Sequence, residues 1–233
     1  MRSRIRIMAV VGLVAAVLVC STGCLFNIFQ TARTIGAGNV ALVIGTGLVN
    51  LTGSEDAEGY YLTPQARVAI GIADGVDLGL QTGFLVSLAG EDSAWGAATA
   101  DLKFALLRDS ESFAIAVGLG GGYSIETWGW EVLGEVIIEW SPFSPFLYVS
   151  PVQTPATPEY VVWRPTPSIF LSYQLEMPFS FSGTALFHHF TAGLAMQLGK
   201  DLRVLLQADA AFTPNPFYTA FYYGYGLGFE VGF

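Results

Sequence analysis

The sequence predicts an all-β fold, an antiparallel transmembrane β-barrel, and three observations lead to this prediction. Charged residues make up only 12% of the 233 residues, and hydrophobic residues make up 52%. An average soluble domain carries about twice that charged fraction. Beyond the first residues, no strongly apolar stretch reaches the length of about 20 residues that a membrane-spanning helix needs. Large apolar residues instead alternate with small or polar ones along the chain, which is the period of a β-strand.

The alternation is clearest in two segments. From Val76 to Leu88, apolar residues and Thr82 occupy every second position. From Phe221 to Phe233, seven apolar residues alternate with Tyr222, Glu230 and four glycines. Because backbone polar groups within lipid must bond to one another, strands cross a membrane only as a closed barrel. Small residues fit the crowded interior of a narrow barrel, so the large apolar residues are expected to face lipid.

The N-terminal residues have the pattern of a cleaved signal helix. Three arginines precede an apolar run from Ile7 to Val19, and small residues then lead to Cys24. The run is too short to span a bilayer and has the layout of a secretory signal. It resembles a bacterial lipoprotein signal, in which the cysteine is lipidated, although Ser21 stands where that family usually has Leu. An ordinary signal that is cut nearby is the alternative.

Three regions follow from these patterns: a signal peptide at 1–23, a periplasmic lead-in at 24–35 and the barrel at 36–233. About twelve strands are predicted, an even number as bacterial barrels require, and Asp74–Gly75 predicts a tight hairpin. Seven prolines lie between Ser141 and Ser168. Proline is unfavourable within a strand ladder, so ten strands is the alternative if 145–164 is a loop. The predicted strands are 39–49, 61–72, 76–88, 96–107, 112–123, 131–140, 145–151, 159–164, 168–176, 187–198, 202–212 and 220–233.

Charged residues on the inner face of the barrel are expected to pair with one another, because pairing offsets the free energy of burying ions. The predicted lumen charges are the bases Arg67, Lys103 and Arg203 and the acids Asp77, Asp101, Asp209 and Glu230. Glu135 and Glu139 share one face of a strand and would add to the acidity of the lumen. The predicted outer loops are acidic as well, which would hold divalent cations near the surface.

From about residue 36 to 233 the chain resembles bacterial small outer-membrane β-barrel proteins. The aromatic C-terminal strand carries this resemblance, and its last apolar residues are Phe229, Val231 and Phe233. The resemblance implies that these three residues are an assembly signal, recognised by the barrel-assembly machinery. It also implies that the protein is located in the bacterial outer membrane after export directed by the signal peptide.

Residues with catalytic chemistry are few, and no catalytic, cofactor-binding or metal-binding residue is assigned. Without the signal at most one cysteine is left, which excludes a Cys-based metal site and an intramolecular disulfide. His189 and Thr191 share a strand face and distantly resemble the His-x-Ser motif of outer-membrane lipid A deacylases. That resemblance implies a lipid-modifying enzyme with Thr191 as nucleophile, His189 as its base and Glu230 as a third member.

The predicted function is therefore that of an outer-membrane barrel of unassigned role: a narrow cation-preferring pore for small solutes, or a structural or surface protein. A lipid A deacylase-like enzyme and a periplasmic lipoprotein with a soluble β-sandwich are the alternatives. The expected partners are outer-membrane lipid and the assembly machinery, with small solutes or divalent cations as further candidates. A net charge of −9 without a basic patch argues against nucleic acid.

Overall fold

The structure is a computed structural model. It describes residues 29–52, 59–89, 94–107, 112–124, 129–142, 166–180, 183–184, 186–198, 201–212 and 221–233. No helix in these ranges is long and apolar enough to span a bilayer. The strands are β1 (Val40–Thr52), β2 (Gly59–Leu62), β3 (Gln65–Ala73), β4 (Val76–Ser87), β5 (Ala94–Leu107), β6 (Phe113–Ser124), β7 (Gly129–Trp140), β8 (Thr166–Ser180), β9 (Gly183–Thr184), β10 (Phe187–Gln197), β11 (Leu202–Phe212) and β12 (Phe221–Gly232).

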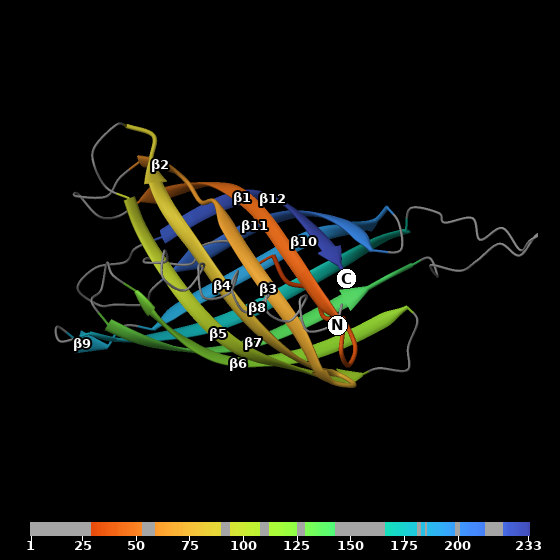
Figure 1. Ribbon diagram of the computed structural model, residues 1–233. Coiled ribbons are helices and arrows are strands. Elements are labelled where there is room, and N and C mark those ends of the chain that lie inside the picture. Colours follow the sequence, from red (N-terminus) through yellow and green to blue (C-terminus); the bar gives the residue numbers. More distant parts are fainter. Residues whose placement is uncertain are drawn as a thin grey trace, which may run out of the picture.

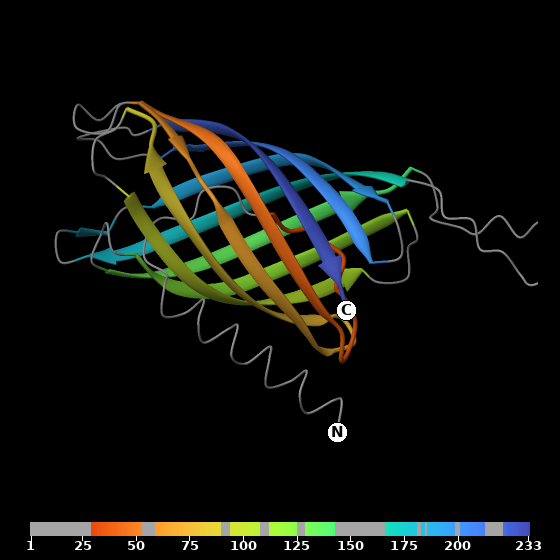
Figure 2. The same cartoon turned by 45° about the horizontal axis from the view of Figure 1, so that its top comes forward.

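These strands close into one antiparallel barrel of ten strand positions (Figure 1). The order around the ring is β1, β3, β4, β5, β6, β7, β8, β10, β11 and β12. β12 then pairs with β1, from Ala41 opposite Gly232 to Thr52 opposite Phe221. Figure 2 shows this closing pair, with the C-terminal end of β12 beside the start of β1. The barrel fold predicted from the alternation is confirmed.

Two short strands extend their neighbours and add no position to the ring. β2 pairs with β1 and β4, the same two neighbours that β3 has, so β2 and β3 form one interrupted strand. The interruption lies at Thr63 and Pro64, because proline has no N–H to donate to the ladder. The ladder still continues there, since the Pro64 carbonyl accepts a hydrogen bond of 3.0 Å from Phe84 N. β9 likewise pairs with the end of β8.

The ring has ten strand positions, which is the alternative count and not the preferred twelve. The two additional strands were predicted at 145–151 and 159–164, which lie outside the described residues. The ring has no position for them between β7 and β8, because these two strands pair directly, from Trp130 opposite Phe179 to Trp140 opposite Ile169. The single closed sheet also contradicts the soluble β-sandwich, which requires two separate sheets packed face to face.

The two faces of the wall have the compositions that the alternation predicts. In β12, Tyr223, Tyr225 and Phe229 are exposed on the outside, whereas Tyr222 and Gly224 are buried inside. The same division holds in β11, where Leu202 and Leu206 face outward. Exposed apolar side chains thus cover the outer wall, as contact with lipid requires.

The barrel has two different ends. At the terminal end β1 begins and β12 ends, and the tight Asp74–Gly75 turn joins β3 to β4 with a φ of 74° at Gly75. The opposite end, the loop end, carries the connections after β1, β4, β6 and β11. The long connection from Trp140 to Thr166 differs from these connections, since both its ends lie at the terminal end. The acidic loop segments 53–58 and 90–93 lie outside the described residues.

The first prediction concerns the outer face. Leu206→Arg, near the middle of β11, is expected to lower the free energy of unfolding in phospholipid vesicles by roughly 2–4 kcal/mol. Leu202→Arg, at the end of the same strand, is the matched control, with an expected loss of about 0–1 kcal/mol because the side chain reaches the interface. Urea unfolding of the refolded protein measures both. Equal losses would show that this face does not contact hydrocarbon.

Candidate functional site: the barrel lumen

Residues 29–35, which we call the plug segment, lie inside the barrel. Between this segment and β1 the chain reverses, with φ of 84° at Gly36 and 78° at Gly38, a conformation that glycine adopts without strain. Gly38 N donates a hydrogen bond of 2.8 Å to Gly71 O of β3. A side chain at Gly71 would lie 1.8 Å from Gly36 O, so glycine is required for this approach. The chain therefore passes from the plug segment in the lumen to the start of β1 at the terminal end.

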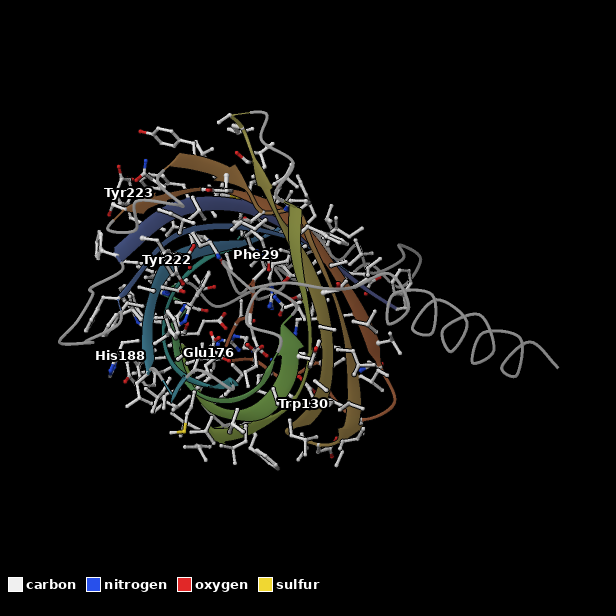
Figure 3. All side chains as sticks on the ribbon, turned by 90° about the vertical axis from the view of Figure 1, so that its left-hand side faces the viewer. Phe29, Trp130, Glu176, His188, Tyr222 and Tyr223 are labelled. Carbon is white, nitrogen blue, oxygen red and sulfur yellow. The ribbon has the colours of Figure 1, made fainter. Side chains whose placement is uncertain are left out.

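Phe29 occupies a groove that glycines leave on the inner wall (Figure 3). A Cβ atom at Gly45 of β1 would lie 2.2 Å from its ring, and one at Gly226 or Gly228 of β12 would lie 2.8 Å away. Larger residues at these positions would displace Phe29, because packed interiors do not absorb such overlap. Phe29 is 3% exposed and forms a buried cluster with Val43, Phe170, Ala195 and Leu205.

Two charged residues of the wall hold the backbone of the plug segment. Lys103 Nζ donates to the carbonyl oxygens of Thr31, at 3.1 Å, and Arg33, at 2.8 Å. Asp77 Oδ2 accepts a hydrogen bond of 3.2 Å from Ile35 N. An extended segment inside a barrel has no neighbouring strand for its backbone, and buried backbone groups need partners. The wall charges supply these partners.

Side chains of the plug segment bond to further wall residues. Gln30 accepts a hydrogen bond of 2.8 Å from Arg67 Nη2 and donates one of 2.7 Å to Glu135 Oε2. Arg203 Nη1 donates to Thr31 Oγ1 at 3.0 Å. The segment thus bridges β3, β7 and β11 across the lumen.

Arg33 links the plug segment to β7, since its Nε lies 3.3 Å from Glu139 Oε1. Glu139 is only 1% exposed and also accepts a hydrogen bond of 2.9 Å from Ser168. A carboxylate that is buried so deeply is destabilising unless it is paired and hydrogen-bonded. The plug segment therefore supplies the counter-charge for Glu139.

The structure brings together six of the seven predicted lumen charges in three ion pairs. Arg67 donates to Asp101 Oδ1 at 2.8 Å, Lys103 Nζ lies 3.3 Å from Asp77 Oδ2, and Arg203 Nη1 lies 3.4 Å from Glu230 Oε1. The seventh, Asp209, has no ion pair among the described residues. It accepts hydrogen bonds of 2.6 Å from Thr191 and 3.0 Å from Gln207 instead.

Carboxylates outnumber bases on the inner wall. Glu135 and Glu139 point inward, as their shared face predicts, and so do Glu131 and Glu176, which sequence reasoning missed. The alternation could have found them, because Glu131 lies four residues before Glu135 on the same strand face. In the described strands, three bases (Arg67, Lys103 and Arg203) face the lumen against eight acids: Asp77, Asp101, Glu131, Glu135, Glu139, Glu176, Asp209 and Glu230.

His189 and Thr191 both face the lumen near the loop end, but they do not form a nucleophile and base pair. The Thr191 hydroxyl donates to Asp209. His189 Nδ1 is hydrogen-bonded to the Tyr222 hydroxyl, and its Nε2 lies 3.1 Å from Glu176 Oε2. Glu230, the predicted third member, lies eight residues from Tyr222 along β12, which corresponds to about 27 Å at a rise of about 3.4 Å per residue.

The other predicted positions lie outside the lumen. Phe229 and Phe233 face outward, and Val231 is partly buried on the same face. Cys24 and the signal peptide lie outside the described residues. Among those that the structure describes, no three His, Cys, Asp or Glu side chains are grouped to hold a metal ion.

Residues 29–35, which belong to the predicted lead-in at 24–35, lie within the barrel. No periodic pattern marks such a segment, since its contacts are made by single side chains and backbone groups. Only the glycine pair at 36 and 38 indicates a reversal of the chain.

The space that remains beside the plug segment is small. One cavity of about 20 Å³ lies between Gln30, Arg67, Asp101 and Glu135. A single water needs about 10–15 Å³ by this measure, so the cavity has room for one water and not for a solute.

No protein-family model and no curated protein matches the sequence. Solved structures with a similar fold include the N-terminal β-barrel domain of OprF from Pseudomonas aeruginosa, at 10% identity and a TM-score of 0.37, covering 85% of this chain and 99% of that one. The NanC porin aligns at 9% identity and a TM-score of 0.47, covering 81% and 98%. Neisserial surface protein A aligns at 6% identity and a TM-score of 0.40, covering 83% and 98%.

The second prediction tests the contact between Phe29 and the glycine groove. Gly45→Ala is expected to lower the free energy of unfolding by about 1–3 kcal/mol, because the methyl group overlaps the ring. Most of this loss should disappear when Phe29→Ala is also present, as a double-mutant cycle would show. Gly134→Ala is the matched control, since a Cβ there meets nothing within 4 Å. The same loss with and without Phe29 would contradict the contact.

Proposed function

We propose that this protein is a closed barrel of the bacterial outer membrane with a structural or surface role, sealed by its own plug segment. The observation that carries the proposal is the position of residues 29–35 in the lumen, where they bond to wall charges from several strands. The apolar outer wall supports a location in lipid. The outward-facing residues of β12 support recognition by the barrel-assembly machinery.

The acid excess of the wall bears on what the lumen would conduct. Eight acidic side chains against three bases leave an excess of five acidic residues on the described inner wall, and Arg33 of the plug segment pairs with one of the acids. Negative charge that lines a pore attracts cations and repels anions. The cation-preferring path predicted from the sequence therefore becomes available only when the plug segment leaves the lumen.

The third prediction is an electrical measurement on the refolded protein in a planar bilayer. The unchanged protein is expected to show no stable conductance steps, because the plug segment lies in the lumen and bonds to wall residues of several strands. A variant lacking residues 29–35 is expected to show steps that prefer cations. A second variant, Phe29→Ala with Arg33→Ala, keeps the chain length and should open intermittently, because it removes the groove contact and the ion pair to Glu139.

The matched control for these variants is Phe212→Ala, which removes an aromatic ring from the outer wall and should stay silent. Folding of each variant is checked by its unfolding transition. Steady conductance of the unchanged protein would overturn the proposal, and so would silence of a folded, inserted deletion variant.

We further propose that the role is not enzymatic. His189 and Thr191 are buried on the inner face, with 9% and 7% of their surface exposed, whereas lipid lies against the outer face. The predicted base would have to be hydrogen-bonded to the attacking hydroxyl, but the Thr191 hydroxyl donates to Asp209, and His189 bonds to Tyr222 and pairs with Glu176.

The fourth prediction addresses this point. His189→Ala is expected to leave the acylation of lipid A unchanged in cells that produce the protein, as judged by mass spectrometry of extracted lipid A. Cells that lack the protein are the control. Deacylated lipid A that depends on both the protein and His189 would restore the enzymatic alternative.

A further inference from the structure

The outer wall of the barrel has a hollow between β8, β10 and β11. Its volume is about 470 Å³, within the range of about 300–1,000 Å³ that ligand sites occupy. The strand register explains it. Ala192 of β10 lies opposite Ala208 of β11, and Phe190 lies opposite Ala210. Three methyl groups therefore line this part of the wall, beside the larger side chains of Leu171, Tyr173 and Phe190.

His188 lies two residues from Phe190, which lines this hollow, on the side of the loop end. His188 faces outward in β10, and Figure 3 shows it pointing away from the barrel while Glu176 points into it. Among the outward-facing residues of the described strands, His188 alone can carry a positive charge, and none of those residues is acidic. A titratable group on the lipid face of a membrane protein is unfavourable unless it has a partner there.

His188 is held in position by its neighbours. Its Nδ1 lies 2.9 Å from the Tyr173 hydroxyl, and its ring stacks on Phe212 with centroids 5.0 Å apart. Phe190 stacks on the same Phe212 ring at 6.1 Å. When the Tyr173 hydroxyl donates to Nδ1, the imidazole carries its proton on Nε2 and can donate a second hydrogen bond.

The hollow and the imidazole lie one below the other along the barrel. Ala192 follows His188 by four residues on the same strand face. With a rise of about 3.4 Å per residue and a tilt of about 40°, the hollow lies about 10 Å deeper in the membrane than His188. That separation is suited to a lipid whose headgroup is at the interface and whose chain runs inward.

We propose that this wall is a binding site for a phosphate-bearing lipid. One acyl chain lies over Ala192, Ala208 and Ala210, and the phosphate accepts a hydrogen bond from His188. Two observations support this occupant. The hollow is lined mainly by apolar surface, and His188, the only basic side chain on the described outer wall, lies four residues from Ala192 toward the loop end. The site shares no residue with the plug segment, so it stands independently of the closed lumen.

The fifth prediction is tested by native mass spectrometry of the refolded protein in detergent, with phosphatidylglycerol or diacylglycerol added as the probe. The unchanged protein is expected to retain one phosphatidylglycerol molecule and to bind diacylglycerol, which lacks the phosphate, at least tenfold more weakly. Ala208→Phe fills the hollow and should weaken retention of phosphatidylglycerol at least tenfold.

Two further variants distinguish the contribution of the lipid headgroup to binding from that of the acyl chain. His188→Phe keeps an aromatic ring on Phe212 and should bind phosphatidylglycerol no better than diacylglycerol. Ala100→Phe, on the outward face of β5, is the matched control and should bind as the unchanged protein does. Equal binding by Ala208→Phe would overturn the proposal, and so would equal binding of both lipids by the unchanged protein. A dimer that Ala208→Phe disrupts, without retained lipid, would show instead that the hollow joins two copies of this chain.

Discussion

The closure of the sheet between β12 and β1 is the constraint on which the rest of the structure depends. Once this pair forms, each of the ten strand positions of the ring has two hydrogen-bonded neighbours, and the ring has no open edge. Closure also means that every second side chain of each strand points into a narrow interior. Each inward residue is therefore small, or packs in a buried apolar cluster such as that of Val43, Phe170 and Leu205, or is polar with a partner. The glycines of β12 and the ion pairs of β3, β4 and β5 are two responses to this one requirement.

The plug segment completes the packing of that interior. Ten strands enclose more space than their own inward side chains fill, since the groove beside Gly45, Gly226 and Gly228 is open until Phe29 enters it. Lys103 shows how wall and plug depend on each other: it pairs with Asp77 and also binds two carbonyl groups of the plug segment. The wall charges thus have two roles, one toward each other and one toward the segment.

The outer wall has a different requirement. Its side chains need only be apolar, because lipid packs against apolar side chains of any shape, whereas a charge is unfavourable there. His188 departs from that requirement, since it is the one outward-facing side chain of the described strands that can carry a positive charge, and it lies near the hollow that alanines of β10 and β11 line. Departures from a local rule are expected at functional or strained sites. Because the plug segment occupies the lumen and the outer wall has a hollow, we expect partners to bind on the outside of the barrel.

The sequence by itself determined the all-β class, the two faces of each strand and the positions of the lumen charges, because a period of two depends only on local backbone geometry. It also placed the tight turn at Asp74–Gly75. Tertiary structure alone decided the closure at ten positions, the partner of each charge and the entry of residues 29–35 into the lumen. The physical reason is that these depend on which wall lies across the barrel. Phe29 meets glycines about 200 residues away in β12, and no local pattern records such a contact.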